Sequence, residues 1–214
     1  MTNAPGGLLA VWMEPPPESE DDFNRWYDEE HLADRISLPG FSRVRRYRCL
    51  RGEPKYLALY ELAGKDALNT DEYNHARQHP TPWTKRVTGY VTKSVRREYE
   101  ALSALGETPP EGAPYVLVIG LETEPEHDAE LNRWYEEEHL AALQSVPGVY
   151  SARRYRALDG GSPKYLAVYE WQTADIRESD AWKKAADTPW TLQMRPRFTS
   201  RTDHLGQLLK TVKK

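Results

Sequence analysis

Short apolar runs and longer polar stretches alternate along the chain, and the same alternation occurs twice. Residues 8–13 and 115–121 are almost wholly apolar, which is typical of short buried strands. Each run is followed by a segment in which aromatic and titratable residues recur every three or four positions, as they do on one face of a helix. Pro-Gly pairs at 39–40 and 147–148 end these helical segments, because proline and glycine interrupt helices.

The remainder of each half predicts two more strands, a second helix and a last strand. In the first half, two strands are expected at roughly 41–50 and 54–62, joined by a glycine-containing turn, which predicts a hairpin. A weaker helical segment covers about 65–87 in the first half and 174–194 in the second, and strands are expected near 90–100 and 197–204. The element order β-α-β-β-α-β in each half is that of a ferredoxin-like unit.

The two halves are also copies at the level of sequence. Asn-Arg-Trp-Tyr-Asp-Glu-Glu-His-Leu at 24–32 returns as Asn-Arg-Trp-Tyr-Glu-Glu-Glu-His-Leu at 132–140, and the offset of later matches stays between 107 and 109 residues. Two copies of domain size predict a fused pair rather than a solenoid, whose repeats are shorter and more numerous. We therefore expect one unit at 1–105, a Pro- and Gly-rich linker at 106–114, and a second unit at 115–214.

The apolar pattern of the predicted strands indicates how the two units associate. Residues 56–60 and 165–169 are nearly continuous apolar runs, which indicates strands that are buried on both faces. One face of each sheet is expected under its own helices, and the other against the sheet of the other unit. The predicted fold class is α+β, with two tandem ferredoxin-like units packed sheet to sheet as an intramolecular barrel.

A known family shares these motifs. The succession Trp-Tyr-x-Glu-Glu-His-Leu, Pro-Gly, Arg-Arg-Tyr-Arg and Tyr-Leu-Ala-x-Tyr-Glu, present in both halves, resembles the dimeric α/β-barrel superfamily and most closely its EthD-like branch. The resemblance implies the barrel fold but not one reaction. The superfamily includes cofactor-free monooxygenases, muconolactone isomerases, polyketide cyclases, haem-handling enzymes and proteins without a known role.

Composition excludes several classes of function. The 29 Lys and Arg residues are balanced by 33 Asp and Glu, so no nucleic-acid partner is expected. The absence of a secretory signal or a long apolar run, with Cys49 as the single cysteine, predicts a cytoplasmic protein without membrane contact. No nucleotide, structural zinc or serine-hydrolase motif occurs, and no cofactor or metal is expected. The expected partner is a small-molecule substrate, with a further homodimer of the fused chain left open.

Candidate catalytic residues lie on the first predicted helix. Glu30 and His31 lie three and four residues after Tyr27, and Asp34 lies four and three residues after them, so the four share a face. We assign His31 as general base, Tyr27 as acid or oxyanion donor, and Glu30 or Asp34 as the carboxylate that orients the imidazole. The EthD-like resemblance also implies a catalytic role for His31. The alternative is that Tyr-x-x-x-His is a structural pair without chemistry.

Further residues are candidates for binding the substrate. They are aromatic walls, a strand arginine, a histidine pair four residues apart, and the second-half copies of the catalytic pair: Trp12, Trp26, Trp83, Arg46, His75, His79, Tyr135 and His139. Two imidazoles four residues apart can hold a metal, but a third ligand is missing, and a polar helix face is the preferred interpretation. Trp182 and Ala186 are aligned with this pair in the second half, and Ala142 replaces Asp34, which favours the first half as the specialised site.

These observations leave more than one function open. The leading hypothesis is cofactor-free acid/base chemistry of the isomerase, cyclase or lyase type on an aromatic or polyketide-like substrate. The first alternative is a cofactor-independent or haem-dependent monooxygenase, with an axial haem ligand drawn from His31, His75, His79 or His139. The second alternative is a non-catalytic binding or scaffold protein.

Overall fold

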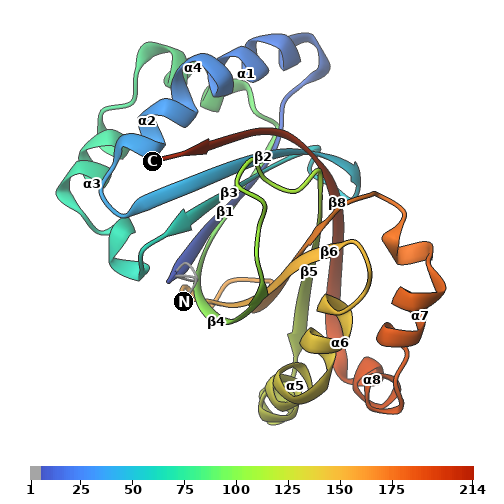
Figure 1. The fold of residues 1–214 in the computed structure, drawn as a ribbon. Coiled ribbons are helices and arrows are strands. Elements are labelled where there is room, and N and C mark those ends of the chain that lie inside the picture. The colour runs from blue at the N-terminus through green and yellow to red at the C-terminus, as the bar shows by residue number, and fades with distance from the viewer. Residues whose placement is uncertain (1–5) are drawn as a thin grey trace.

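The computed structural model describes residues 6–214, which form one closed barrel with helices on two opposite sides (Figure 1). The strands are β1 (Gly7–Glu14), β2 (Phe41–Arg51), β3 (Tyr56–Leu62), β4 (Lys93–Gly106), β5 (Tyr115–Thr123), β6 (Val149–Ala157), β7 (Tyr165–Trp171) and β8 (Phe198–Lys213). The helices are α1 (Glu20–Trp26), α2 (Leu32–Ser37), α3 (Asp71–Gln78), α4 (Pro82–Tyr90), α5 (Asp128–Trp134), α6 (Leu140–Gln144), α7 (Asp180–Ala186) and α8 (Pro189–Met194). The predicted α+β class and the pairing of two ferredoxin-like units are confirmed.

The barrel closes through hydrogen bonds between the two halves. Its antiparallel strand order is β1-β3-β2-β8-β5-β7-β6-β4, so β2 pairs with β8 and β4 pairs with β6. The two sheets therefore face each other across the barrel and also join at their edges, which removes every free edge. β4 and β8 extend beyond the predicted 90–100 and 197–204, because their later residues pair with the opposite half, a contact that local sequence does not encode.

The interior of the barrel is an apolar cluster to which both halves contribute. β3 and β7 are buried along their whole length, as the continuous apolar runs predicted. The interior side chains come from alternate positions of the strands: Leu8, Ala10, Trp12, Tyr47, Leu57, Leu59, Tyr99, Val116, Val118, Tyr155, Leu166 and Val168.

A buried ionic cluster also crosses between the halves inside the barrel. Arg45 donates to Glu61 at 2.7 Å and to Glu170, and Arg153 donates to Glu170 at 2.9 Å. Glu170 is fully buried and accepts further hydrogen bonds from the hydroxyls of Ser151 and Thr108. Charges removed from water require such partners, so this cluster links the two halves at a defined register.

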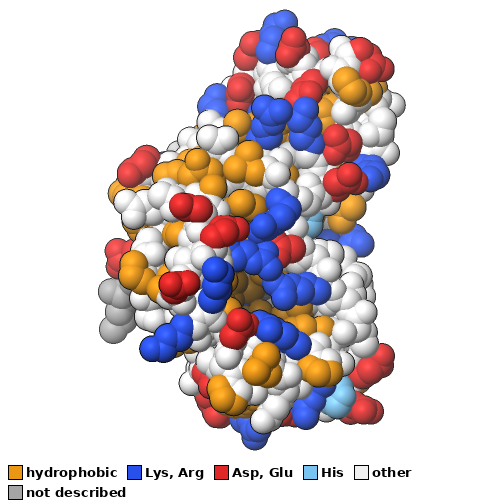
Figure 2. All heavy atoms as spheres, turned by 90° about the vertical axis from the view of Figure 1, so that its right-hand side faces the viewer, with side chains coloured by type: hydrophobic (Ala, Val, Ile, Leu, Met, Phe, Trp, Pro, Cys, Tyr) orange, Lys and Arg blue, Asp and Glu red, His pale blue; other side chains and the backbone are white. Residues whose placement is uncertain are grey.

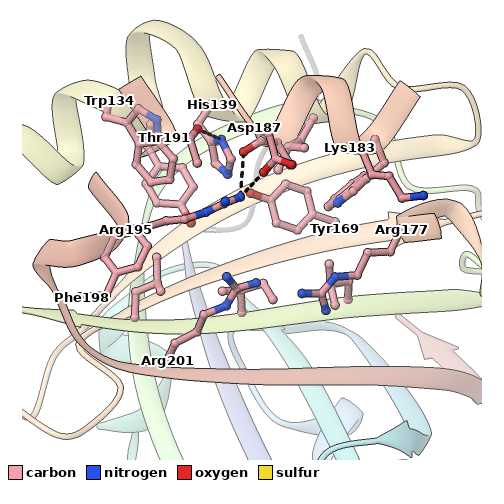
Figure 3. Close-up of a pocket in the computed structure, with 17 residues that line it drawn as sticks. Trp134, His139, Tyr169, Arg177, Lys183, Asp187, Thr191, Arg195, Phe198 and Arg201 are labelled. Atoms are coloured by element: carbon pink, nitrogen blue, oxygen red, sulfur yellow. Dashed lines mark hydrogen bonds and ion pairs between the residues drawn. The ribbon is translucent and has the colours of Figure 1, made fainter. Parts of the chain in front are cut away.

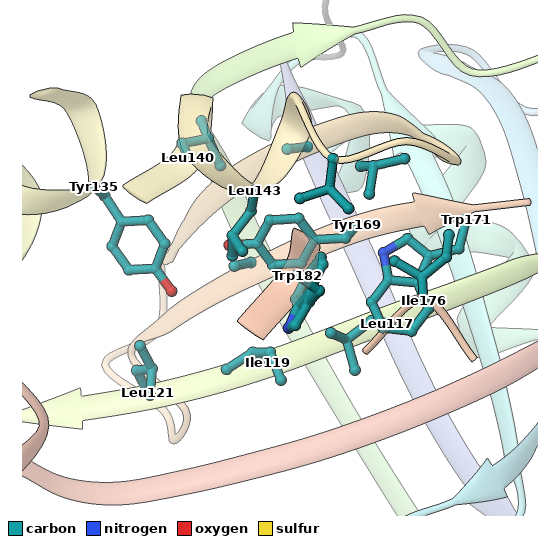
Figure 4. Packing of buried hydrophobic residues seen from close by; sticks show 14 of the residues in the cluster. Leu117, Ile119, Leu121, Tyr135, Leu140, Leu143, Tyr169, Trp171, Ile176 and Trp182 are labelled. Carbon is teal, nitrogen blue, oxygen red and sulfur yellow. The ribbon is translucent and has the colours of Figure 1, made fainter. Parts of the chain in front are cut away.

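The outer faces of the two sheets pack under the helices. In the second half, Tyr169, Trp171 and Trp182 form a tight aromatic group beside Leu117 and Ile119 (Figure 4). The predicted weak helix at 65–87 is two helices, α3 and α4, because Pro82 starts a new helix whose amino terminus is capped by the Thr81 hydroxyl. Among the helices of residues 6–214, none has the length and apolar character that crossing a bilayer requires.

Candidate functional site

The Trp-Tyr…His segment of each half is a wide π-helical turn inserted between two α-helices. It spans Tyr27–His31 in the first half and Tyr135–His139 in the second. The widened turn brings residues five apart together: the rings of Trp26 and His31 lie 4.1 Å apart between centroids. π-Helical turns are rare and occur frequently at functional sites. The presence of one in each half therefore indicates that this segment belongs to a functional site.

A pocket lies between these helices and the outer face of the sheet in the first half. We call it the N-terminal pocket; it encloses about 850 Å³, including its opening to solvent. Its lining has an apolar floor from β1, an aromatic wall, one imidazole and three guanidinium groups: Leu9, Val11, Met13, Trp26, Tyr27, His31, Arg35, Tyr60, Tyr73, Ala76, Arg77, Pro80, Thr84, Thr88 and Arg96. An apolar pocket with a few convergent polar groups is the usual form of a small-molecule site.

His31 presents an unpartnered nitrogen in this pocket. Its Nδ1 atom is buried and has no hydrogen-bond partner within residues 6–214. Burial, together with the positive charges of Arg35 and Arg46, holds the pKa of His31 well below its usual range. The imidazole is therefore unprotonated at neutral pH and can accept a proton or a hydrogen bond from a bound molecule.

Two tyrosine rings lie near the imidazole. Tyr27 is buried, its ring contacts that of His31 at 5.2 Å, and its hydroxyl points to the sulfur of Met13 at 3.3 Å. The Tyr60 hydroxyl is buried near that of Tyr27 but lacks a well-formed hydrogen bond within the described chain. Burial raises the pKa of both phenols, so each remains a protonated donor.

The predicted orienting carboxylates do not reach His31. Glu30 accepts hydrogen bonds from the hydroxyls of Thr81 at 2.6 Å and Thr84 at 3.1 Å, and so ties the π-turn to the start of α4. Asp34 is exposed and lies outside the pocket lining. The expected contact of Glu30 or Asp34 with the imidazole is therefore wrong, because the wide turn directs Glu30 to α4 and Asp34 to solvent.

Three other predicted binding residues also lie away from the pocket. Trp12 is on the opposite face of β1, inside the barrel. The indole N–H of Trp83 donates a hydrogen bond to the Asp22 carboxylate at 3.1 Å, on the outer side of α4. Arg46 is buried behind the pocket wall, with its guanidinium carbon 4.3 Å from the Tyr27 ring centroid. Their predicted contact with a substrate in this pocket is not supported by these positions.

The histidine pair is exposed on α3 and its carboxyl end. The rings of His75 and His79 stack at 4.2 Å and do not line the N-terminal pocket. Within residues 6–214, no group of three or more His, Cys, Asp or Glu side chains is placed to hold a metal. The predicted alignment of His75 with Trp182 is wrong. Thr70 and Ser179 cap the equivalent helices α3 and α7, and each accepts a hydrogen bond from the residue three positions later, so Tyr73 is the counterpart of Trp182.

The second half contains a related pocket, which we call the C-terminal pocket. It encloses about 760 Å³, and its aromatic wall repeats that of the first, with Trp134, Tyr135, His139 and Tyr169 (Figure 3). Trp134 stacks on His139 at 4.0 Å. The face of the molecule that carries α7, α8 and β8 shows a hollow surrounded by basic and some acidic side chains (Figure 2).

The two imidazoles have different neighbours. In the first half, Thr84 accepts the indole N–H of Trp26 at 3.0 Å, which leaves His31 Nδ1 free. In the second half, the matching hydroxyl of Thr191 lies 3.4 Å from Nδ1 of His139 instead. Burial, with Arg195 and Arg201, lowers the pKa of His139 to about 3. Tyr135 and His139 thus line a pocket as expected, but His139 is partly satisfied by the protein itself.

Of the residues that line the N-terminal pocket, sequence reasoning named only Trp26, Tyr27 and His31. Arg35, Tyr60, Tyr73 and Arg96 come from α2, β3, α3 and β4 and converge only in the folded chain. One signal was available for Arg35, which lies one helical turn after His31 and is Leu143 in the second copy.

The fold matches several solved structures over nearly their whole length. A candidate monooxygenase from Fusobacterium nucleatum matches with a TM-score of 0.68 and 12% identity, covering 100% of this chain and 96% of that one. An anthrone oxidase-like protein gives 0.65 and 14%, covering 97% and 92%. A chlorite dismutase mutant from Candidatus Nitrospira defluvii gives 0.65 and 13%, covering 97% and 93%.

Identities this low establish the fold and leave the activity open. No family model matches the sequence, and no curated protein matches it closely enough to count as a relative. The closed eight-stranded barrel, the repeated helix pairs and these structural matches agree with one another. The chain therefore has the dimeric α/β-barrel fold, with both halves of the barrel supplied by a single polypeptide.

Proposed function

We propose that this protein is a small-molecule enzyme that removes a proton from an aromatic or polyketide-like substrate in the N-terminal pocket. The observation that carries the proposal is the free Nδ1 of His31, buried in an aromatic pocket and kept unprotonated by its surroundings. His31 would accept the proton, and the hydroxyls of Tyr27 and Tyr60 would donate hydrogen bonds to the enolate or phenolate oxygen that forms.

The depressed pKa has two opposite effects on such a base. The lowered pKa keeps the His31 imidazole unprotonated, and so able to accept a proton, at neutral pH. The same lowered pKa makes the imidazole a weaker base. Since Arg35 contributes to the depression, a negative charge that develops beside Arg35 raises the pKa of His31 as the proton arrives. The positive charge of Arg35 therefore favours the developing anion, while burial continues to disfavour the protonated imidazole.

A cofactor-independent oxygenase is the second candidate, favoured by the names of two structural neighbours, a candidate monooxygenase and an anthrone oxidase-like protein. It begins with the same deprotonation, after which the carbanion reacts with oxygen. For a haem-dependent reaction, His31 and His139 are the imidazoles that line the two pockets, and each has a tryptophan stacked on its ring. A Soret band in the purified protein would favour that route.

The test uses dithranol, an aromatic ketone with an acidic methylene group, as a probe. Without oxygen, deuterium exchange at the methylene reports proton removal alone; with oxygen, quinone absorbance and oxygen uptake report oxygenation. We expect His31→Ala to slow exchange about a hundredfold or more, because general-base catalysis is commonly worth that much.

His139→Ala is the matched control, and it should retain most of the exchange activity because Thr191 already contacts that imidazole. Equal exchange rates in the wild type, the His31 variant and protein-free buffer would refute the chemistry. Equal loss of melting temperature in both variants without any change in exchange would support the structural interpretation of the Tyr-x-x-x-His pair instead.

A further inference from the structure

Three arginine side chains lie around one tyrosine ring in the lining of the N-terminal pocket. The guanidinium carbons of Arg35, Arg77 and Arg96 lie 6.0, 5.9 and 5.9 Å from the ring centroid of Tyr73. Each is close enough for a cation–π contact with the same ring. The three like charges also repel one another, so an arrangement of this kind is stable only where something offsets that repulsion.

The protein supplies little of that compensation. Arg96 pairs with Glu98 at 2.5 Å and donates to the Tyr73 hydroxyl at 2.7 Å. Within residues 6–214, neither Arg35 nor Arg77 has a carboxylate in ion-pair distance, and the buried Nη1 of Arg35 has no hydrogen-bond partner. No Asp or Glu side chain of the described chain lines this pocket. The site therefore has an excess of positive charge beside an unsatisfied donor.

The second copy lacks the arrangement. Arg35 is replaced by Leu143, and the strand registers of β4 and β8 place Asp203 at the position of Arg96. Counted from the equivalent helix caps Thr70 and Ser179, Ala186 is the counterpart of Arg77. The C-terminal pocket has cations at other positions, and three of them have a carboxylate partner. Arg195 pairs with Asp187 inside the pocket (Figure 3), and Arg177 and Arg201 pair with Asp203, which lies outside its lining.

We infer that the N-terminal pocket takes a substrate that carries a carboxylate, bound by Arg35 and Arg77 beside the ring of Tyr73. This inference deepens the proposed function, on which it rests. The aromatic body of the substrate lies on Leu9, Val11 and Trp26, with its acidic C–H or O–H group at His31. Charge-assisted hydrogen bonds from a guanidinium to a carboxylate are among the strongest that side chains form. The carboxylate also offsets the repulsion among the three arginines.

The test compares two probes of the same shape, 2-naphthoate and its uncharged amide, 2-naphthamide, by titration calorimetry on the full chain. The wild type should bind naphthoate about tenfold or more tightly than naphthamide, the usual worth of a charged hydrogen bond. The double variant Arg35→Leu/Arg77→Ala, which installs the residues of the second copy, should bind both equally. Arg77 is exposed, so its single substitution tests the site even if the double variant folds poorly.

Arg201→Ser is the matched control, because Arg201 lines the other pocket and the first copy has Ser94 at that position. It should retain the naphthoate preference. The inference is overturned if the wild type binds the two probes equally, or if Arg201→Ser and not the double variant abolishes the preference. Because the measurement is binding without turnover, failure of the dithranol exchange assay would remove the proposed chemistry and leave this result unaffected.

Discussion

The ionic cluster inside the barrel makes a quantitative prediction about stability. Glu170 is fully buried and is held by Arg45, Arg153 and two hydroxyl groups. Burial alone would raise the pKa of Glu170, but the two arginines and the hydroxyl donors lower it to about 2. We therefore predict that Glu170→Gln destabilises the barrel strongly, although the glutamine has nearly the same shape.

The magnitude follows from the same pKa. An unfolded carboxyl titrates at about 4.5, and the difference from about 2 corresponds to about 3 kcal/mol of folding free energy at neutral pH. Removing one partner of a buried ion pair costs about 3–5 kcal/mol, in agreement with that figure. Because Glu61 remains beside Arg45, the lower end of this range is expected. For a chain of this size, about 3 kcal/mol lowers the melting temperature by roughly 6–12 °C.

The assay is denaturant unfolding of the wild type and Glu170→Gln between pH 7 and pH 2. A depressed folded pKa means that the stabilisation is complete above about pH 4.5 and is lost as pH falls toward 2. The variant should lack that part of the pH dependence. The matched control is Glu29→Gln, which breaks the exposed Arg25–Glu29 pair and should cost about 0.5 kcal/mol or less. Equal effects of the two substitutions at pH 7 would refute the reasoning.

Three further predictions follow from the fold and the pockets. Arg35→Leu should leave the melting temperature of the ligand-free protein unchanged or slightly raised, since it removes an unpaired charge from a cationic cluster; a fall above about 4 °C would contradict this. The imidazole NMR signals of His31 and His139 should not shift between pH 8 and pH 5, and stability should fall below about pH 6.5, where these histidines become protonated in the unfolded chain. A titration midpoint near pH 6.5 in the NMR signal of either histidine would refute the conclusion that burial lowers their pKa. Deleting residues 208–214 should remove most of the β2–β8 pairing, lower the melting temperature and cause concentration-dependent association through the newly exposed edge of β2. An unchanged melting temperature and oligomeric state would contradict the role of this seam in closing the barrel.

Local sequence was sufficient for the element order and for the pairing of two similar units. The apolar runs of β3 and β7 predicted burial on both faces, and the repeated Trp-Tyr…His segment predicted that each copy would carry the same pocket wall. These features depend on residues close together in the chain, where periodicity reports directly on the conformation.

Only the tertiary structure decided which of these residues meet. β1 is apolar on both faces, so its pattern could not show that Trp12 enters the barrel while Leu9 and Met13 face the helices. The π-turn shifts the helix face and directs Glu30 away from His31, which spacings of three and four do not anticipate.

The group of three arginines in the N-terminal pocket likewise depends on the tertiary structure. Arg35, Arg77 and Arg96 belong to three elements, and each by itself resembles an ordinary solvated charge. The sequence thus determined the elements and their repetition, because these are short-range properties. The barrel seams and the convergence of charges in one pocket were decided by contacts between distant segments, which only the closed barrel brings together.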